Sequence, residues 1–338
     1  MYLITGGTGL IGSHLILELL KKGEQVRAIF RSEKSLDKVK NLFGYYSNEP
    51  AALFGKIDWV QADINDIVAL EHAFNGITHV YHCAALISFD PKQYQHLKKS
   101  NVEGTKNMVN LCIKHKVKKL GYVSSIAALG SSTREEWITE ETEWTNKNAT
   151  VYGLTKHRAE LQVWRGSQEG LPVFIVNPGV VLGPGFWKSG SGTFFYYAAK
   201  ASSYALPGGT GFIAVHDVIS CMVQLMDSTI KNERFILVDE NALYLDIVQR
   251  IAKSMGVSLP VKTLGRGKIE LFWRLDWIRS KFFGKKRRLS KNMAKSLFKR
   301  EQYDNSKIKK SLALEFSGLD PTIEFCSKRF KEAFPKLF

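Results

Sequence analysis

A glycine-rich turn at the start of the chain constrains the fold more than any other feature. The sequence TGGTGLIG places Gly6, Gly9 and Gly12 between the apolar run YLIT and a segment of helical period. At this spacing Gly6 can form a tight turn, Gly9 can let a pyrophosphate approach the backbone, and Gly12 can let helix and strand pack closely. The helix is expected to begin near Gly12, with its free N–H groups facing the phosphates. The motif therefore predicts a dinucleotide-binding turn, whereas the glycines alone would also fit a simple turn.

Apolar runs of strand length alternate with segments of helical period along the first 180 residues. The runs are YLIT, QVRAIF, IDWVQAD, HVYHCA, KLGYVSS and VFIVNPG. This order predicts parallel strands joined by right-handed crossovers. The runs HVYHCA and VFIVNPG lack alternation, which is typical of strands buried on both faces. We expect an α/β fold with a Rossmann-like, doubly wound parallel sheet.

A smaller unit is expected after residue 180, where Gly, Pro and aromatic residues dominate. The stretches LGPGFWKSGSGTFFYY and YALPGGTGF are not expected to form regular core elements. We predict a nucleotide-binding domain of residues 1–180, to which 213–240 return, and a substrate-binding domain of 181–212 and 241–338. The smaller domain should lie over the carboxyl edge of the sheet, where ligands of this architecture bind.

The end of the second predicted strand indicates which cofactor is bound. An NAD enzyme usually offers an acid to the ribose hydroxyls there, but QVRAIFRSEK offers Phe30 and Arg31. A guanidinium suits the 2′-phosphate of NADP, so we expect NADP(H), with NAD(H) as the alternative and Lys38 adding charge. Arg31 could instead be a solvated loop residue. Asp63 and Ile64 follow the third strand as candidate adenine contacts, unless Asp63 caps the helix that follows.

Two serines at a strand end and a Tyr–Lys pair form the candidate catalytic group. The strand KLGYVSS delivers Ser124 and Ser125 to the carboxyl edge, and YGLTK follows with Tyr152 and Lys156. Residues four apart share one helix face, so we expect the Lys156 ammonium beside the Tyr152 phenol, where it lowers the phenol pKa from about 10. Tyr152 would then serve as general acid and base, and Ser125 would hydrogen-bond the substrate oxygen. An exposed helix pair shows the same spacing.

Seven motifs stand in the order found in the extended short-chain dehydrogenase/reductase family, within the NAD-dependent epimerase/dehydratase superfamily. They are TGGTGLIG, HCAA, NVEGT, VSSIAALG, YGLTK, NPGVVLGPG and VHDV, and the resemblance covers essentially the whole chain. It implies Tyr152 as acid/base, Lys156 as its electrostatic partner and ribose ligand, and Ser125 rather than Ser124 as oxygen ligand. The cofactor contacts that it implies are Gly6, Thr8, Gly9, Leu10, Ile11, Gly12, Ala84, Ala85, Tyr152, Lys156, Pro178 and Gly179. Asn101 matches an asparagine tied to a proton-relay water in some relatives, with a structural helix role as the alternative.

Within that family, VRAIFRS and NPGVVLGPG are similar to the dihydroflavonol 4-reductases and the 3β-hydroxysteroid dehydrogenase relatives. Leu86, Ile87 and Phe89, in the run LISFD, indicate an apolar substrate unless they are core residues. The expected activity is NADP(H)-dependent reduction of a carbonyl, or oxidation of a secondary alcohol, on a mostly apolar small molecule. The alternatives are an NAD-dependent nucleotide-sugar epimerase or dehydratase, and an NADP-sensing protein without turnover.

Most of the positive charge lies near the carboxyl end. The net charge is +16, and residues 262–338 contain 21 basic and 8 acidic residues. The segment 269–300 interleaves Trp273, Trp277, Phe282 and Phe283 with Arg and Lys. It could contact an anionic membrane surface or a polyanion such as nucleic acid. It could also be a substrate-domain helix with its aromatic rings packed inward.

Targeting, membrane-spanning and metal-binding signals are missing from the sequence. No apolar run approaches the roughly 18 residues of a spanning helix, and the opening MYLITGG lacks a secretory pattern. The four cysteines are far apart and form no CxxC pair. We expect a cytoplasmic protein without a bound metal, and a dimer is one expectation for its assembly.

Overall fold

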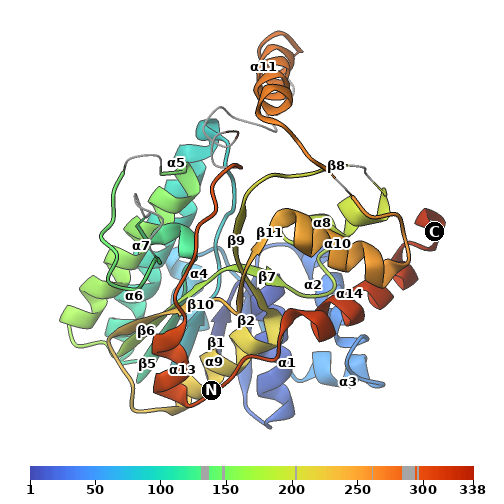
Figure 1. Cartoon of the computed structure of the whole chain (residues 1–338). Coiled ribbons are helices and arrows are strands. Elements are labelled where there is room, and N and C mark those ends of the chain that lie inside the picture. The colour runs from blue at the N-terminus through green and yellow to red at the C-terminus, as the bar shows by residue number, and fades with distance from the viewer. Residues whose placement is uncertain (131–136, 147–148, 202–203, 261, 284–293, 295–296) are drawn as a thin grey trace.

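The centre of the molecule is a seven-stranded parallel sheet (Figure 1). The computed structural model describes residues 1–130, 137–146, 149–201, 204–260, 262–283, 294 and 297–338. The strands lie in the order β10-β6-β5-β4-β1-β2-β3. Their bounds are β1 (Tyr2–Thr5), β2 (Val26–Phe30), β3 (Asp58–Gln61), β4 (His79–His82), β5 (Lys119–Val123), β6 (Val173–Pro178) and β10 (Glu233–Leu237). Because β1 pairs with β2 on one side and β4 on the other, the strand order reverses there, and ligands bind at such a reversal.

Helices cover both faces of this sheet. Alternate strand residues divide between two cores, so that Ile4 joins α1 (Leu10–Lys21) and α9 (Val215–Asp227) while Leu3 joins the opposite face. That opposite face is covered by α4 (Ile67–Ala73), α6 (Gly104–Lys114) and α7 (Val151–Gln168). Every residue of β5 and β6 is buried, as expected for strands between two helical layers. The predicted Rossmann-like fold is confirmed.

The remaining elements of the amino-terminal half connect these strands. They are α2 (Leu36–Phe43), α3 (Pro50–Gly55), α5 (Tyr94–Leu97), the 3₁₀ turns η1 (Glu33–Ser35), η2 (Pro91–Gln93) and η4 (Ile126–Ala128), and the π-helical segment η3 (Lys98–Glu103). The first helix begins at Leu10, two residues before Gly12, near which the sequence predicts its start. Gly9 has extended backbone angles and takes the N-cap position.

A second, three-stranded sheet lies beside the first, in the order β11-β9-β7. Its strands are β7 (Val180–Leu182), β9 (Gly209–Ala214) and β11 (Glu240–Leu243), and its helices are α8 (Gly192–Ala199), α10 (Tyr244–Met255) and α14 (Leu319–Ala333). The expectation that 181–212 forms no regular core element is wrong. Phe195 on α8 is fully buried and β9 is buried throughout, because GTFFYYAA packs its apolar side chains into a core shared with α10 and α14.

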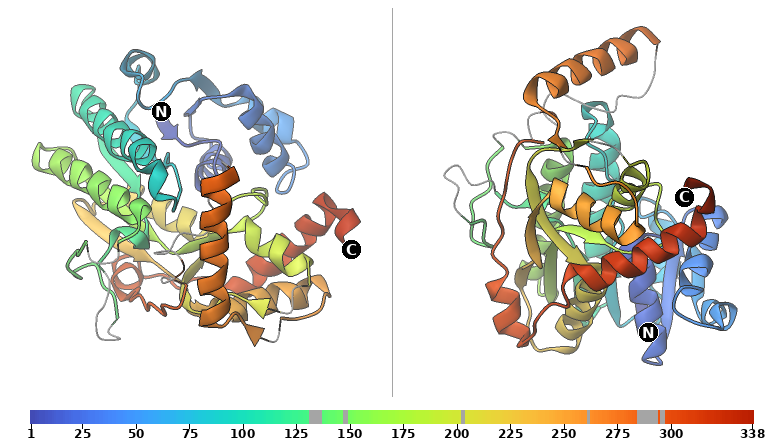
Figure 2. Two further views of the ribbon diagram at one scale, coloured as in Figure 1. Left: turned by 90° about the horizontal axis from the view of Figure 1, so that it is seen from above. Right: turned by 45° about the vertical axis from the view of Figure 1, so that its right-hand side comes forward.

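One helix stands away from the rest of the molecule. It is α11 (Arg266–Phe283), which projects from the end of the molecule where α5 lies (Figures 1 and 2). The other carboxyl-terminal elements are β8 (Tyr204–Ala205), β12 (Lys262–Thr263), α13 (Ser306–Leu312) and η5 (Pro335–Leu337). The basic run at 285–288 lies outside the described residues. Within the described part of the chain, no helix combines the length and apolar character needed to cross a membrane.

Candidate active site

The glycine turn is held by close backbone contacts at two of its three glycines. Gly6 has φ +68°, and a Cβ there would lie 2.7 Å from the Ala84 nitrogen. A Cβ on Gly12 would lie 2.3 Å from the Gly6 carbonyl oxygen. Any larger residue would push the turn away from β4 or α1 away from the turn, so these two glycines are explained by packing inside the protein.

Gly9 has more open surroundings, and the start of α1 lacks a capping partner. Outside its chain neighbours, a Cβ on Gly9 would meet one atom within 4 Å, the Gly6 oxygen at 3.3 Å. No side chain caps α1 and no acid lies in its first turn, which leaves its first N–H groups available to an anion. The turn therefore fits the pyrophosphate of a dinucleotide. Leu10, Ile11 and Thr8 are half-buried beside it.

A buried hydrogen-bond network behind the turn was not predicted from the sequence. The Thr5 hydroxyl and the His82 Nδ1 lie 2.6 Å apart, and the His82 Nε2 lies 3.0 Å from the Thr105 hydroxyl. The Ala84 N–H donates to the Thr5 hydroxyl, so the network fixes the backbone that faces Gly6. Burial lowers the pKa of His82 to about 3, and the ring is therefore neutral. Polar residues at the ends of β1 and β4 were the available signal.

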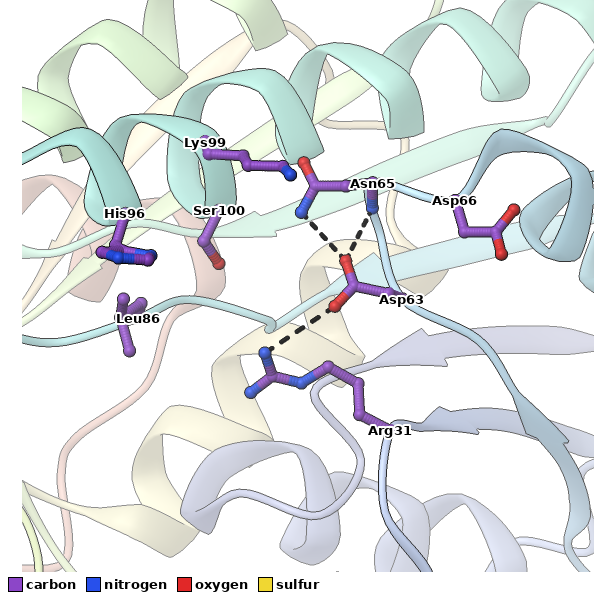
Figure 3. A pocket seen from close by; sticks show the side chains of 8 residues that line it. All are labelled: Arg31, Asp63, Asn65, Asp66, Leu86, His96, Lys99 and Ser100. Carbon is purple, nitrogen blue, oxygen red and sulfur yellow. Dashed lines mark hydrogen bonds and ion pairs between the residues drawn. The ribbon is translucent and has the colours of Figure 1, made fainter.

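Arg31 and Asp63 come together in a pocket beside the carboxyl ends of β2 and β3 (Figure 3). The Arg31 guanidinium lies 3.8 Å from the Asp63 carboxylate. The Asp63 Oδ1 accepts from the backbone and side chain of Asn65 at 2.8 and 2.9 Å. Asp63 is not the helix cap, because Asp66 caps α4. The pocket, of about 390 Å³, is lined by Arg31, Asp63, Asn65, Asp66, Leu86, His96, Lys99 and Ser100.

Two predicted cofactor residues lie apart from this pocket. Lys38 is exposed on α2 and does not line it. Ile64 is buried, and a Cβ on Gly104 would lie 2.5 Å from its Cδ1. The Ile64 side chain thus belongs to the core between β3 and α6. Lys99 and His96 take the place of Lys38 as basic groups in the pocket, and nothing in the local sequence distinguished them from other surface residues.

Tyr152 lies at the start of α7 and is buried. Thr150 caps this helix by accepting from the Gly153 N–H, which fixes where Tyr152 leaves the backbone. Burial raises the pKa of Tyr152 to about 12, and a side-chain hydrogen bond with Ser125 partly offsets this rise. The predicted decrease in the phenol pKa is therefore wrong for this structure. Tyr152 is a protonated phenol at neutral pH.

Lys156 is fully buried and turns to the strand beneath it. Its Nζ donates to the Tyr122 hydroxyl at 2.6 Å and to the Val123 carbonyl at 2.8 Å. These two partners on β5, and not the Tyr152 phenol, hold the amine, which explains why the phenol pKa is not lowered. Burial lowers the pKa of Lys156 to about 7, while the Glu160 carboxylate acts to raise it. The Lys156 ammonium is thus close to its titration point at neutral pH.

The glycine turn and the Tyr–Lys pair lie at the same carboxyl edge of the sheet, where ligands of this architecture bind in a crevice. The Cys83 backbone carbon would lie 2.8 Å from a Cβ on Gly6, and Cys83 also lies close enough to Lys156 to raise the pKa of that amine. Cys83 is therefore a neighbour of both the glycine turn and Lys156. The alternative of an exposed helix pair is excluded, since Tyr152 and Lys156 are both buried.

Glu160 continues the same face of α7 one turn beyond Lys156 and was missed in the sequence. It is buried, accepts from the Asn177 side chain at 2.6 Å and pairs with Arg234 at 3.4 Å. Burial raises the pKa of this carboxyl, and Ser124 is close enough to lower it in part. The two serines thus have different neighbours, Ser125 facing Tyr152 and Ser124 facing Glu160. The spacing YxxxKxxxE in the sequence indicates that Glu160 lies on the same helix face as Tyr152 and Lys156.

Asn101 has a structural role in this structure. It lies in the π-helical segment η3 and is buried. Its side-chain amide donates to the Leu86 carbonyl at 3.0 Å and to the Thr155 hydroxyl at 3.1 Å, and its oxygen accepts from the Leu86 N–H at 2.8 Å. Asn101 therefore joins the loop after β4 to α7, on which Tyr152 and Lys156 lie.

Apolar side chains of that same loop reach the phenol. The Phe89 ring lies 5.8 Å from the Tyr152 ring in an edge-on arrangement. Ile87 and Phe89 are exposed and Leu86 is half-buried, so these residues are not core. Ala84 and Ala85 precede them, half-buried and exposed. The loop places hydrocarbon next to the predicted proton donor.

Pro178 and Gly179 end β6 on the other side of the crevice. Pro178 is buried. A Cβ on Gly179 would lie 2.4 Å from the Gly211 carbonyl oxygen on β9, so glycine is needed where the two sheets meet. Packing between sheets therefore accounts for Gly179.

Comparisons with known proteins agree with this geometry. The family model described as NAD dependent epimerase/dehydratase family matches residues 2–237. The sterol demethylase protein B of Methylococcus capsulatus is 28% identical over 265 residues, which cover 76% of this chain and 75% of that protein. A putative dihydroflavonol 4-reductase of Synechocystis is 28% identical over 271 residues, covering 78% and 75%.

A solved structure also shares the fold over nearly its full length. The crystal structure of gox2253 superposes with a TM-score of 0.81 at 24% identity and covers 98% of both chains. The family match spans more than half of the chain, from the first strand to the end of β10. The protein belongs to the NAD dependent epimerase/dehydratase family and is an NAD(P)-dependent enzyme of the extended short-chain dehydrogenase/reductase type.

Proposed function

We propose that the protein is an NADP(H)-dependent oxidoreductase that interconverts a carbonyl and a secondary alcohol on a mostly apolar small molecule. The contact of the exposed Phe89 ring with the buried Tyr152 phenol carries this proposal. A substrate whose oxygen reaches Tyr152 must lay its neighbouring carbons against Phe89 and Ile87. Such a surface favours hydrocarbon over the hydroxyls of a sugar.

A dinucleotide held at the turn of Gly6 and Gly9 would supply the hydride for the carbonyl carbon in the reduction, and the protein would supply the proton. Tyr152 gives its phenolic proton to the carbonyl oxygen as the C–O double bond becomes single, and Ser125 donates a hydrogen bond to the same oxygen. The raised pKa of Tyr152, about 12, keeps this phenol protonated before the reaction. The Lys156 ammonium, one helical turn away, would turn from Tyr122 and Val123 to the resulting phenolate and stabilise it. Oxidation of the alcohol runs through the same steps in reverse.

The preference for NADP(H) rests on the basic side of the pocket in Figure 3. It is lined by Arg31, which follows β2, by His96 on α5 and by Lys99 on η3. The Arg31–Asp63 separation of 3.8 Å is long for an ion pair between exposed side chains, so the guanidinium can turn to a phosphate at little cost. Asp63 would accept from the adenine amino group. NAD(H), which lacks the 2′-phosphate, would bind more weakly.

The division of labour between the two sheets is part of the proposal. Residues 1–180 and 213–240 would bind the cofactor, and 181–212 with 241–338 would form the substrate-binding domain. The family also contains NAD-dependent epimerases and dehydratases, and a nucleotide-sugar reaction is the second candidate. An NADP sensor without turnover is disfavoured by Tyr152 and Lys156, which are both buried, because burying such ionisable side chains costs stability.

A thermal-shift comparison tests the cofactor assignment. NADPH and NADH at equal concentrations should both raise the unfolding midpoint, NADPH by more, because a ligand that binds the native state stabilises it. Arg31→Gln should reduce the NADPH shift and spare the NADH shift, while the matched control Lys38→Gln should change neither. A larger shift with NADH in the wild-type protein would contradict the assignment.

A substrate screen tests the reaction. Consumption of NADPH should be found with apolar ketones or aldehydes and should not be found with nucleotide sugars. The epimerase alternative makes the opposite prediction, because an epimerase consumes no cofactor and commonly retains it. NAD released from the denatured protein, together with conversion of a nucleotide sugar, would replace our proposal with that alternative.

A further inference from the structure

The excursion that contains α11 is tied to the body at both of its ends. Strand β12 pairs in parallel with β8 just before α11 begins. After the excursion, the Gly209 N–H donates to the Lys299 carbonyl at 2.9 Å. Both attachments lie at the β8–β9 region, so α11 leaves the body and returns to it at one place. Its position over the carboxyl edge is therefore set by the fold.

One face of α11 carries an exposed apolar stripe. The stripe consists of Leu271, Leu275, Ile278 and Phe282, with exposed fractions of 55%, 52%, 42% and 70%. The spacing i, i+4, i+7, i+11 places all four on the same side of the helix. Phe272 and Trp277 are also exposed, outside the stripe.

The opposite face of the helix is less exposed than the stripe. Ile269 at its base is buried, the Asp276 side chain is 11% exposed and Trp273 is half-buried. The Trp273 indole N–H donates to Glu270 at 2.8 Å, and the Lys268 ammonium donates to the Tyr204 hydroxyl at 3.1 Å. α11 is thus joined to the body at its amino-terminal end, and the apolar stripe lies on the side of the helix opposite Ile269, Trp273 and Asp276. An amphipathic helix in a water-soluble domain normally has the reverse orientation.

The sequence of α11 and of the residues that follow it is strongly basic. Residues 266–300 contain 13 basic and 2 acidic side chains. The Lys281 ammonium lies 5.0 Å from the Trp277 ring centre and 6.0 Å from that of Phe282, and Arg274 lies over the Trp273 ring. Hydrocarbon, aromatic rings and basic groups on one projecting helix together match the acyl chains, the interface and the anionic headgroups of a bilayer.

We propose that α11 docks the protein onto an anionic lipid surface, with the stripe in the boundary between headgroups and acyl chains. Figure 1 and the right view of Figure 2 show α11 projecting beyond the rest of the chain that the structure describes, so a flat surface can reach it. The positive charge would attract a nucleic acid, but a nucleic acid offers no apolar surface on which the four side chains of the stripe could pack. Docking would turn the carboxyl edge of the sheet toward the bilayer. The inference does not depend on the reaction assigned above.

Vesicle co-sedimentation of the full chain tests this inference. The wild-type protein should bind vesicles of phosphatidylcholine mixed with phosphatidylglycerol, bind phosphatidylcholine alone more weakly, and lose affinity as salt is raised. Replacing all four stripe residues by glutamine should weaken binding by about a hundredfold. The single variant Phe282→Gln, at the most exposed position of the stripe, should weaken vesicle binding about three- to tenfold. This variant changes only one residue of α11.

The matched control removes exposed hydrocarbon elsewhere. Ile67 and Val68 on α4 are 55% and 72% exposed, and the double variant Ile67→Gln/Val68→Gln should bind vesicles like the wild type. Circular dichroism and the unfolding midpoint establish that each variant is folded.

Three results would overturn the inference. The first is no vesicle binding by the wild-type protein at low salt. The second is binding that survives loss of the stripe. The third is a wild-type dimer that becomes a monomer in the stripe variant without any vesicle binding, which would assign the stripe to a second copy of this chain. Binding to DNA without binding to vesicles would overturn the inference in the same way as the first result.

Discussion

The crevice at the carboxyl edge of the sheet and the projecting helix α11 depart from the ordinary distribution of residues in opposite directions. The crevice buries ionisable groups, with Lys156 and Glu160 each 1% exposed. α11 exposes hydrocarbon, with Phe282 70% exposed. Buried charge and contiguous exposed apolar surface both lower the stability of a monomer in water. Each is therefore evidence of function, chemistry in the first region and contact with a surface in the second.

If this comparison holds, changes in the crevice should alter turnover strongly, and changes on α11 should not. The largest effect short of removing Tyr152 is expected from Lys156→Met, which keeps the length of the side chain and removes its charge. We expect kcat for carbonyl reduction to fall by about 10²–10³-fold, because the developing phenolate loses its counter-charge. A steady-state assay measures kcat, and a decrease of less than about threefold would show that Lys156 does not take part in the reaction.

A larger side chain in the glycine turn should weaken cofactor binding more than it affects the folding of the distant helix α11. Gly12→Ala places a Cβ 2.3 Å from the Gly6 carbonyl oxygen, so α1 and the turn must move apart. We expect a loss of about 1–3 kcal/mol in the free energy of unfolding and a smaller NADPH thermal shift. Gly55→Ala is the control, since a Cβ on Gly55 meets nothing within 4 Å. Equal NADPH shifts in the two variants would contradict the assigned turn.

Removing the apolar wall should change substrate affinity more than turnover. Phe89→Ala deletes the ring that lies 5.8 Å from Tyr152. An aromatic contact is worth about 0.5–1.5 kcal/mol beyond its area, so KM for an apolar ketone should rise about two- to tenfold. Trp137→Ala removes another exposed ring outside the crevice and should leave KM unchanged. A rise in KM in both variants would argue against a specific wall.

The buried acid Glu160 should shift the pH dependence of kcat/KM by acting on the pKa of Lys156. Lys156, with a pKa of about 7, is charged below this pH and neutral above it, so kcat/KM for reduction should fall as pH rises through about 7. The Glu160 carboxylate raises the pKa of Lys156. Glu160→Gln removes that charge and should move this limb of the profile to lower pH. A limb that stays in place, or moves to higher pH, would show that Glu160 does not act through Lys156.

The stripe variant of α11 completes the comparison with the smallest expected effect. Glutamine at Leu271, Leu275, Ile278 and Phe282 should leave kcat with a water-soluble substrate within about twofold of the wild type, because exposed positions away from a site contribute little. A large loss of kcat in a folded stripe variant would mean that α11 takes part in the reaction, and the two regions would then not be separate.

The sequence predicts those parts of the site that depend on local spacing. Gly6, Gly9 and Gly12 follow one strand, and Tyr152 and Lys156 are one helical turn apart, so neither set needs knowledge of distant contacts. The fold class follows for the same reason, since alternating strands and helices leave few topologies. The domain division remains a prediction.

Contacts between distant elements account for what the sequence does not reveal. The Lys156 amine turns to Tyr122 and Val123 because β5 lies directly beneath α7, and the helix pattern contains no information on this direction. Lys38 is exposed although it follows Arg31 closely, and Lys99 reaches the pocket from another element. In α11, apolar residues at helical spacing indicate a stripe but not whether it faces the protein or the solvent.

The account depends most directly on Tyr152 as the group that moves the proton, and Tyr152→Phe tests this with a single oxygen atom removed. Once a substrate is identified, kcat should fall by about 10²–10⁴-fold, while the NADPH thermal shift stays as in the wild type. Tyr2→Phe, at the opposite end of the sheet, should have full activity. Wild-type turnover by Tyr152→Phe would contradict the proposed mechanism.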